Sequence, residues 1–282
     1  MEFYGSGSST FKPFEALKYL RFEDMPDWEN WLCFDSENEG EAFPRLEVLK
    51  IVSCRKLTGV SLPDKMHLLL PSLESLSISK CPMLQSFSEG GLPTNLKSIS
   101  IKDCDKLVAS RTTWGLQKLP SLQEVSIGGK CEDVESFPEP TLLPMTMTSL
   151  TISGFPNMTS LDKKGLQHLT FLENLYIRNL PGLKFTPEER LFDSISTLIH
   201  LTIDEIPIMT SLDIMGIQHL TSLKTMEICD CPNLKFLPKD GFPASISSLE
   251  ISGCPLLDKQ LQNRKGKEWH KVGYIPNLWM NY

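Results

Sequence analysis

The chain has 282 residues, 40% of them apolar, and a formal net charge of −7 at pH 7. This acidic balance argues against a general binder of nucleic acid or of anionic membranes. No run of 18 apolar residues occurs, and we predict no transmembrane segment. The first ten residues lack the basic and apolar regions of a signal peptide. We therefore expect a cytoplasmic protein whose eight cysteines are reduced thiols.

One apolar spacing recurs along nearly the whole chain, and it is clearest between Leu73 and Leu84. Within this stretch, Leu76-Ser77-Ile78 alternates with the period of a β-strand, and Cys81-Pro82 then predicts a turn. The spacing matches the leucine-rich repeat, L-x-x-L-x-L-x-x-N/C-x-L. It begins ten times, at Leu17, Leu46, Leu73, Leu96, Leu122, Met147, Leu172, Leu198, Leu223 and Ile246.

Each repeat has too few apolar residues to bury them alone, so neighbouring repeats must share one core. We predict an α/β solenoid: a leucine-rich-repeat horseshoe with a parallel sheet on its concave face and irregular or short helical returns on its convex face. Residues 1–13 are predicted to form an N-terminal loop, residues 14–258 a solenoid of about ten repeats, and residues 259–282 a C-terminal cap.

Three returns between strands have similar sequences, at residues 115–119, 165–169 and 216–220. Each lies between a turn and the next strand, where one or two helical turns would fit. Beyond the last repeat, a cap must cover the apolar end of the stack. The residues expected to do so are Trp269, Ile275 and Trp279.

Six cysteines share the turn position of the repeat. Their spacings of 23 residues or more resemble no zinc motif, and the expected compartment disfavours disulfides. We interpret them as small buried residues that close the turn. They are Cys54, Cys81, Cys104, Cys131, Cys231 and Cys254.

Strand positions not used by the core are predicted to face solvent on the concave side, which is the usual binding surface of a solenoid. The earlier repeats offer Lys50, Lys80 and Lys102 on this face. The candidate protein-binding residues of the later repeats are Tyr176, Arg178, His200, Asp204, Glu205, Glu227, Asp230 and Glu250. Two interpretations stay open: a partner-binding surface with a basic end and an acidic end, or an ordinary solvated face.

The sequence predicts no enzyme. It contains no phosphate-binding loop of the form G-x-x-x-x-G-K-[ST], no G-x-S-x-G and no H-E-x-x-H. His200 has no cysteine or serine beside it in a nucleophile pattern. We therefore assign no catalytic residue, no cofactor-binding residue and no metal ligand.

Several segments are similar to those of one known family. Residues 26–31 read P-D-W-E-N-W, residues 43–49 read F-P-R-L-E-V-L, and residues 266–269 read G-K-E-W. Cys-Pro-x-Leu turns recur at Cys81 and Cys231. These segments resemble the C-terminal repeat region of plant intracellular immune receptors, the coiled-coil nucleotide-binding leucine-rich-repeat disease-resistance proteins.

The resemblance implies a protein partner: a pathogen effector, a guarded host protein, or the nucleotide-binding module of a full-length relative. It covers the repeat region only, so no nucleotide-binding residue is carried over. We expect a truncated chain that lacks this module and exposes the apolar end of its first repeat. Two other classes fit less well. A substrate receptor of a ubiquitin ligase would need an adaptor-binding box, which residues 1–45 do not supply, and a secreted receptor would need a signal peptide.

Overall fold

The computed structural model describes residues 14–29, 43–58, 66–87, 91–185, 192, 195–213 and 216–281. The loop predicted at residues 1–13 and the second tryptophan of the P-D-W-E-N-W segment lie outside these residues. The chain divides into two compact units, residues 1–131 and residues 132–282, which we describe in turn.

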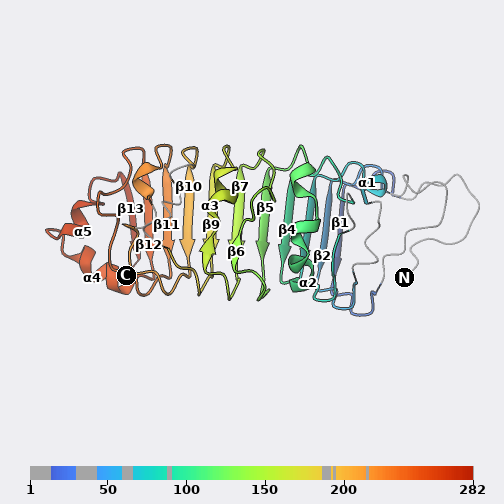
Figure 1. The fold of residues 1–282 in the computed structure, drawn as a ribbon, viewed down its shortest axis with the longest axis horizontal. Helices are drawn as coiled ribbons and strands as arrows, with labels where there is room; N and C mark the ends of the chain where they lie inside the picture. The colour runs from blue at the N-terminus through green and yellow to red at the C-terminus, as the bar shows by residue number, and fades with distance from the viewer. Residues whose placement is uncertain are drawn as a thin grey trace, which may run out of the picture. The chain divides into compact units, whose positions relative to one another are not determined.

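The first unit contains a parallel sheet in which the strands follow one another in chain order (Figure 1). Its strands are β1 (Tyr19–Glu23), β2 (Val48–Val52), β3 (Ser75–Ser79), β4 (Ser98–Lys102) and β5 (Glu124–Gly128). Short helices interrupt the returns: α1 (Met66–Leu69), α2 (Asp105–Ala109), η3 (Arg111–Thr113) and η4 (Leu116–Lys118).

The second unit repeats this arrangement with a parallel sheet in the order β7-β9-β10-β11-β12-β13. The bounds are β7 (Ser149–Ser153), β9 (Asn174–Arg178), β10 (His200–Asp204), β11 (Thr225–Cys229), β12 (Ser248–Ser252) and β13 (Asn277–Asn281). Two short strands in the returns pair with each other, β6 (Ser136–Phe137) and β8 (Ser160–Leu161). The helices are α3 (Lys163–Gln167), η6 (Ile217–His219), α4 (Pro255–Gln262) and α5 (Lys267–His270).

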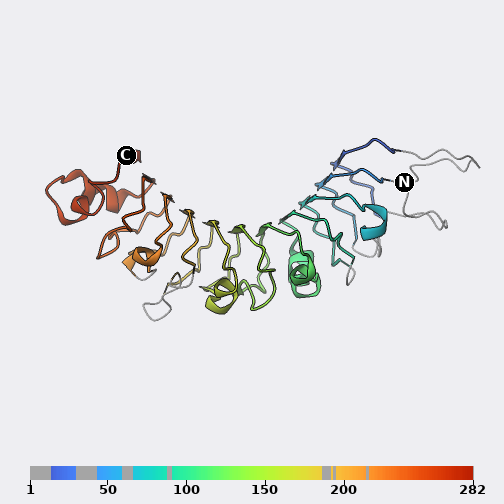
Figure 2. The ribbon, with the colours of Figure 1, turned by 90° about the horizontal axis from the view of Figure 1, so that it is seen from above.

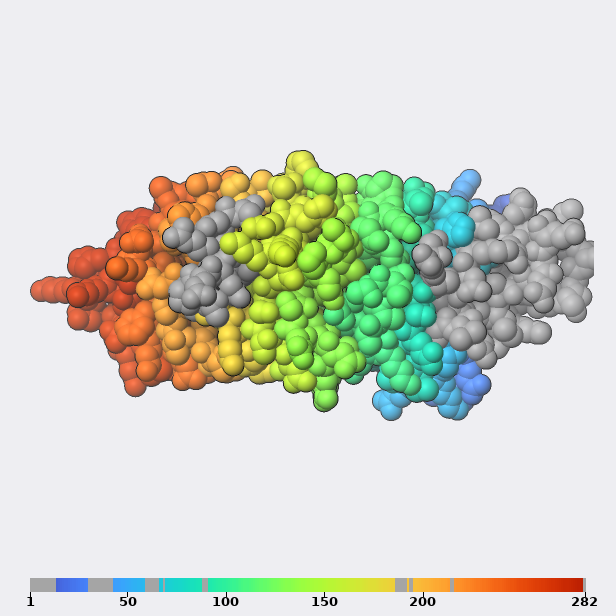
Figure 3. Space-filling model, in the orientation of Figure 1, coloured from blue at the N-terminus to red at the C-terminus, as the bar shows by residue number. Residues whose placement is uncertain are grey.

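All ten predicted strands are present, and each begins two residues after the predicted start of its repeat. The fold is therefore a leucine-rich-repeat solenoid, as predicted. Within each unit the strands line one side, and short helices such as α2 and α3 lie on the other (Figure 2). Figure 3 shows the helical side of each unit, where the returns pack against one another in chain order.

The core lies between the sheet and the returns. In the repeat that begins at Leu73, the side chains of Leu73, Leu76, Ile78, Cys81 and Leu84 are fully buried. The register aligns equivalent residues, so that Leu76 lies between Leu49 and Ile99 of the adjacent strands. Each leucine or isoleucine is thus buried by its counterparts in the neighbouring repeats.

The cysteines close the turns at the ends of the strands. The thiols of Cys81, Cys104 and Cys231 each donate a hydrogen bond of 3.2–3.4 Å to the carbonyl two residues earlier. The Cys81 backbone N–H in turn donates to Cys104 Sγ over 3.4 Å. A hydrogen bond with Cys81, together with burial, raises the pKa of the Cys104 thiol. All six turn cysteines are at most 4% exposed, which confirms that they are small buried residues.

A residue in the left-handed region follows most strands. Lys80, Glu205 and Asp230 have φ values of 55°, 53° and 47°. Each donates its backbone N–H to the last residue of the next strand; for example, Lys80 donates to Lys102 over 2.9 Å and Glu205 to Cys229 over 3.1 Å. These bonds extend the sheet ladder by one residue and turn the chain away from the sheet.

The three similar returns form short helices, as predicted: η4, α3 and η6. Their glycines serve different purposes. Gly115 precedes η4 with φ of 71°, a conformation that glycine adopts without strain. Gly165 lies inside α3, where a Cβ atom would come within 1.9 Å of the Pro138 carbonyl oxygen. Only glycine lets the α3 backbone approach Pro138 this closely.

The C-terminal segment, which the sequence predicts as a cap, ends in a further strand. It contains β13, which pairs in parallel with β12 and adds an eleventh repeat strand. Ile275 is buried, as expected, but the expectation for Trp279 is wrong, because 66% of its surface is exposed. Trp279 lies at an outward position of β13, whereas Val272 and Ile275 are the buried apolar residues before that strand. The predicted boundaries at residues 13 and 258 stay predictions.

An ion pair between buried Glu268 and half-buried Lys271 holds this segment to the repeat that begins at Leu223. Glu268 Oε2 accepts a 2.8 Å hydrogen bond from the Leu237 backbone N–H. Lys271 Nζ donates to Glu268 Oε1 over 2.9 Å and to the Leu237 carbonyl over 3.2 Å. The G-K-E-W sequence thus supplies the acid that satisfies a backbone group about thirty residues away in the chain.

None of the helices in the described residues has the length and apolar character that crossing a membrane requires.

Replacing Leu76 by alanine should lower the free energy of unfolding by about 2 to 5 kcal/mol, since it leaves a cavity in the shared core. Replacing the neighbouring Ser77 by alanine should change the free energy of unfolding by less than about 0.5 kcal/mol, because this side chain points away from the core. Urea unfolding measures both. Equal losses for the two variants would contradict the assignment of sheet faces.

Replacing Glu268 by alanine should lower the free energy of unfolding by about 3 kcal/mol, because it removes the carboxylate partner of Lys271 and the acceptor of the Leu237 N–H. Hydrogen exchange at the Leu237 amide should become faster in this variant. Lys267→Ala, at the exposed first residue of α5, is the control and should leave that exchange rate unchanged. Unaltered Leu237 exchange in the Glu268 variant would show that the contact does not hold the segment.

Candidate functional site

The candidate site is the open face of the sheet in the second unit, which we define as the outward-pointing residues of β9–β13 and the residue after each strand. In β9, β11 and β12 the second and fourth residues are buried, so the first, third and fifth point to the opposite face. The register aligns the third residues in one row: Tyr176, Thr202, Glu227, Glu250 and Trp279. Adjacent strands in a sheet lie about 4.8 Å apart, so neighbours in this row are in reach of one another.

The structure places the predicted residues of this unit at three kinds of position. Tyr176, Glu227 and Glu250 lie in the central row. Arg178 and Asp204 are the last residues of β9 and β10 and lie in register, and His200 is the first residue of β10. Glu205 and Asp230 follow their strands in the left-handed turn, at the edge of the open face.

Hydrogen bonds link His200 to its neighbours on the face. Its Nδ1 lies 2.6 Å from Thr225 Oγ1, and its Nε2 lies 3.0 Å from Thr202 Oγ1. The Thr202 hydroxyl donates to Glu227 Oε2 over 3.1 Å. Thr202 is only 2% exposed, so these bonds satisfy a hydroxyl that solvent does not reach.

This network differs from a catalytic triad. In a triad the carboxylate orients the imidazole, which activates an accessible hydroxyl. Here Glu227 accepts from the threonine, and the nearest approach of its Oε1 to His200 Nε2 is 3.9 Å. The bonded hydroxyl of Thr202 is buried. The arrangement therefore orders side chains on the face.

An aromatic and cationic group lies beside this network. The Arg178 guanidinium carbon is 5.3 Å from the centre of the Tyr176 ring, and the Tyr176 and His200 rings are 5.2 Å apart. A cation at this distance from an aromatic ring is attracted by the ring's negative face. Arg178 is thus held on Tyr176 and in register with Asp204.

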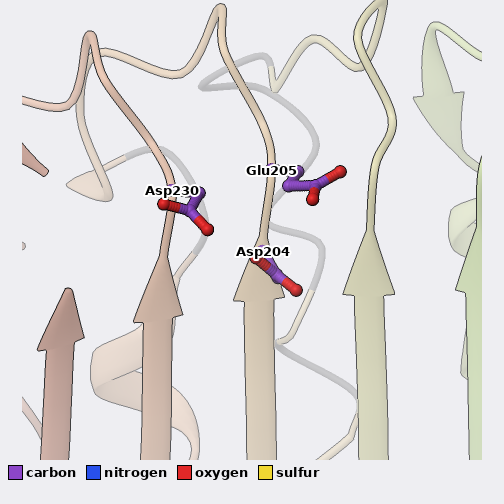
Figure 4. A group of neighbouring side chains, drawn as sticks. All are labelled: Asp204, Glu205 and Asp230. Atoms are coloured by element: carbon purple, nitrogen blue, oxygen red, sulfur yellow. The ribbon is translucent and has the colours of Figure 1, made fainter. Parts of the chain in front are cut away.

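Three acids come together where β10 and β11 end (Figure 4). One carboxylate oxygen from each of Asp204, Glu205 and Asp230 lies within 4.8 Å of the others. Glu205 and Asp230 are exposed, and exposed acids often gather without binding an ion, so the cluster does not by itself make a metal site. Burial raises the pKa of Asp204, against the opposing effect of Arg178, and Asp230 and Glu227 raise it further.

Cys229 is the last residue of β11 and also points to the open face. Burial raises the pKa of its thiol, although a hydrogen bond with Ser252 acts in the opposite direction. The surrounding acids raise it as well. A thiol of this kind is a poor nucleophile and a poor metal ligand at neutral pH.

The lysines of the first unit lie on the equivalent face of their own sheet, where the Lys80 backbone N–H bonds to the Lys102 carbonyl and Lys50 lies on a separate strand. Lys50 is the third residue of β2, Lys102 ends β4, and Lys80 follows β3 in the left-handed turn. Serines of β3 separate Lys50 from the β4 strand, since Ser77 is its register partner. Lys50 Nζ instead lies 5.8 Å from the centre of the Tyr19 ring.

Sequence reasoning missed one prominent residue of the open face, Trp279. The signal was present, because Ile275-x-x-Leu278-x-Met280 has the repeat spacing, with isoleucine at the first position as in the repeat that begins at Ile246. The segment was nevertheless interpreted as a cap. Tyr19 and Arg21 of β1, which lie on the face of the first unit, were also not proposed.

Comparison with known proteins identifies relatives of one kind. No family model matches the chain. It is 38% identical over 148 residues to a putative disease resistance protein of Arabidopsis thaliana, a match that covers 52% of this chain and 10% of the relative. It is 43% identical over 100 residues to the putative disease resistance RPP13-like protein 1 of the same plant, covering 34% and 9%. The chain thus spans about a tenth of the length of these relatives.

A longer but weaker match covers most of the chain. Over 252 residues it is 27% identical to the Arabidopsis thaliana protein SUPPRESSOR OF npr1-1, CONSTITUTIVE 1, covering 80% of this chain and 15% of that protein. Among solved structures, TLR13 in its complex with ssRNA13 aligns with a TM-score of 0.52 and 20% identity, covering 83% of this chain and 37% of that chain. At this identity the likeness concerns the fold alone.

Asp204→Asn should make the protein more stable at neutral pH, because burial raises the pKa of this carboxyl in the folded state. Because the pKa of Asp204 is raised in the folded state, the protonated carboxyl stabilises the fold at pH values below the unfolded pKa of about 3.9. This contribution is lost as the pH rises through the folded pKa. The difference between variant and wild type should therefore shrink on acidification. Denaturant unfolding across this pH range measures it, with Glu132→Gln at an exposed turn as the control. A difference that is constant with pH would contradict the shift.

Proposed function

The chain is a leucine-rich-repeat solenoid related to plant disease resistance proteins, and on this basis we propose that it is the protein-recognition and regulatory repeat region of a plant intracellular immune receptor. The observation that supports recognition most directly is the open face of the second unit. It combines an aromatic at each end of its central row, Tyr176 and Trp279, with a group of acids between and beside them.

This face is suited to binding through its side chains. The strands β9–β12 pair on both sides within the sheet, and β13 pairs with β12 on one side. Those side chains are held at regular spacing by a buried core, and His200, Thr202 and Glu227 are further fixed by hydrogen bonds. Such a face loses little conformational entropy when a partner binds, because its side chains are already ordered.

Binding fits the chemistry of the face better than catalysis does. The hydroxyl nearest to His200 Nε2 is buried, and the half-buried thiol of Cys229 has a raised pKa. We therefore propose a non-catalytic role, without a cofactor.

The partner classes that follow from this proposal are a pathogen effector, a guarded host protein, or the nucleotide-binding module of a full-length receptor. The cytoplasm is the compartment in which such a receptor would meet them. A ubiquitin-ligase substrate receptor is the less favoured alternative, because the relatives described above are disease resistance proteins.

Reversing three charges on the face should remove its partners. We propose proximity labelling in plant cells with the wild type, with D204K/E227K/E250K, and with E132K/D133K/E135K. The last variant makes the same change in net charge at exposed positions of the turn after β5. Proteins labelled by the wild type and by the turn variant, but lost in the face variant, are the expected result. Identical sets from all three proteins would place the binding surface elsewhere.

A further inference from the structure

The two ends of the central row carry the same kinds of group, but only one end is complete. At the β9 end, Arg178 lies over the ring of Tyr176 and in register with Asp204. An aromatic ring, a cation and a carboxylate thus come from two adjacent strands. The chain supplies all three groups at this end: Arg178 contacts the Tyr176 ring, and its charge lowers the pKa of Asp204 against the effect of burial.

The β13 end has the aromatic ring and the carboxylates but no cation. Trp279 lies in register with Glu250, and Glu250 lies in register with Glu227. Among the described residues, no cation lies over the Trp279 ring and no ion pair involves Glu250. With 66% of its surface exposed, Trp279 is the most exposed large apolar residue in the described part of the chain. Tryptophan is enriched among the residues that contribute most to binding at protein interfaces, so an exposed indole beside two acids favours a binding surface.

Small neighbours leave this end accessible. Ser248 and Ser252 flank Glu250 along β12, and Thr225 and Cys229 flank Glu227 along β11. The carboxylates therefore stand above side chains that are too short to cover them. Glu227 is also held in place, because its Oε2 accepts a hydrogen bond from the Thr202 hydroxyl. Its other oxygen, Oε1, lies 3.9 Å from His200 Nε2.

We propose that this end of the face binds an arginine side chain presented by the partner protein, an inference that rests on the recognition function proposed above. The guanidinium stacks on the Trp279 ring and pairs with Glu250, and Glu227 adds a second negative charge one strand further on. Arginine fits better than lysine, because its planar guanidinium both stacks on an indole and donates two parallel hydrogen bonds to one carboxylate.

The charge of the surroundings agrees with this choice. Among the described residues of the open face of the second unit, Arg178 is the one arginine or lysine. The same face carries five acids: Asp204, Glu205, Glu227, Asp230 and Glu250. A basic segment of a partner would be attracted to this face and oriented on it, whereas an acidic segment would be repelled.

The experiment measures binding of the purified chain to a library of short acetylated peptides. The central residue is arginine, lysine, citrulline or glutamate, and the flanking positions are randomised among neutral residues. We expect binders to carry arginine, lysine to bind more weakly, and citrulline, which has the shape of arginine without its charge, to lose binding about tenfold or more.

Variants of the chain assign the binding to this end of the face. Trp279→Ala should weaken binding of the arginine peptides by about threefold to thirtyfold, and Trp279→Phe by less, because the smaller ring attracts a cation less strongly. E227Q/E250Q should weaken it by about tenfold or more. E132Q/D133N, which changes the net charge equally, should have no effect. Trp279 is exposed, so unchanged thermal unfolding of its variants shows that the fold is intact.

The outcomes separate this inference from the proposed function. Peptides that bind equally well with arginine and citrulline, yet lose binding in D204K/E227K/E250K, would overturn the arginine site and leave recognition by the open face standing. Binding that is insensitive to every face variant would overturn both. Absence of any arginine-dependent peptide at concentrations up to about 1 mM would also overturn the arginine site, because two charge contacts and a stacked ring should exceed that affinity.

Discussion

The shared apolar core is the constraint on which the rest of this structure depends. No single repeat can bury its own leucines and isoleucines, so each must align them with those of its neighbours. Leu49, Leu76 and Ile99, for example, stand in register on adjacent strands and are all buried. Because side chains alternate along a strand, the same alignment places the outward residues in rows. The binding face is thus a consequence of how the core is packed.

The turn at the end of each strand separates the core, whose geometry is the same from repeat to repeat, from the face, whose chemistry varies. A buried cysteine such as Cys81 caps the strand end through its thiol, while the left-handed residue before it turns outward. That outward residue makes its structural contribution through its backbone N–H. Its side chain is therefore free to be Lys80 in one repeat and Glu205 or Asp230 in others. Function can change at these positions without disturbing the fold.

On the open face of the second unit, the useful distinction is between polar groups that the chain itself satisfies and those that it does not. His200, Thr202 and Arg178 have partners within the face, and those partners hold them in place. Trp279 and Glu250 lie at the other end of the row without such partners among the described residues. Ordered groups give a face its shape, while unsatisfied groups can gain energy when a partner binds.

The sequence by itself determined where the ten repeat strands lie, which of their residues are buried, and that the cysteines close turns. All of these follow from local alternation and spacing, which neighbouring residues carry along the chain. The sequence carries the repeat spacing at Ile275, Leu278 and Met280, but only the tertiary structure showed that β13 pairs with β12 and leaves Trp279 exposed, because the pairing requires the preceding strand to be in place. It also decided the contact of Glu268 with Leu237 and the order of the His200 network. Those interactions join residues about 25 to 31 positions apart, and their geometry exists only once the repeats are stacked.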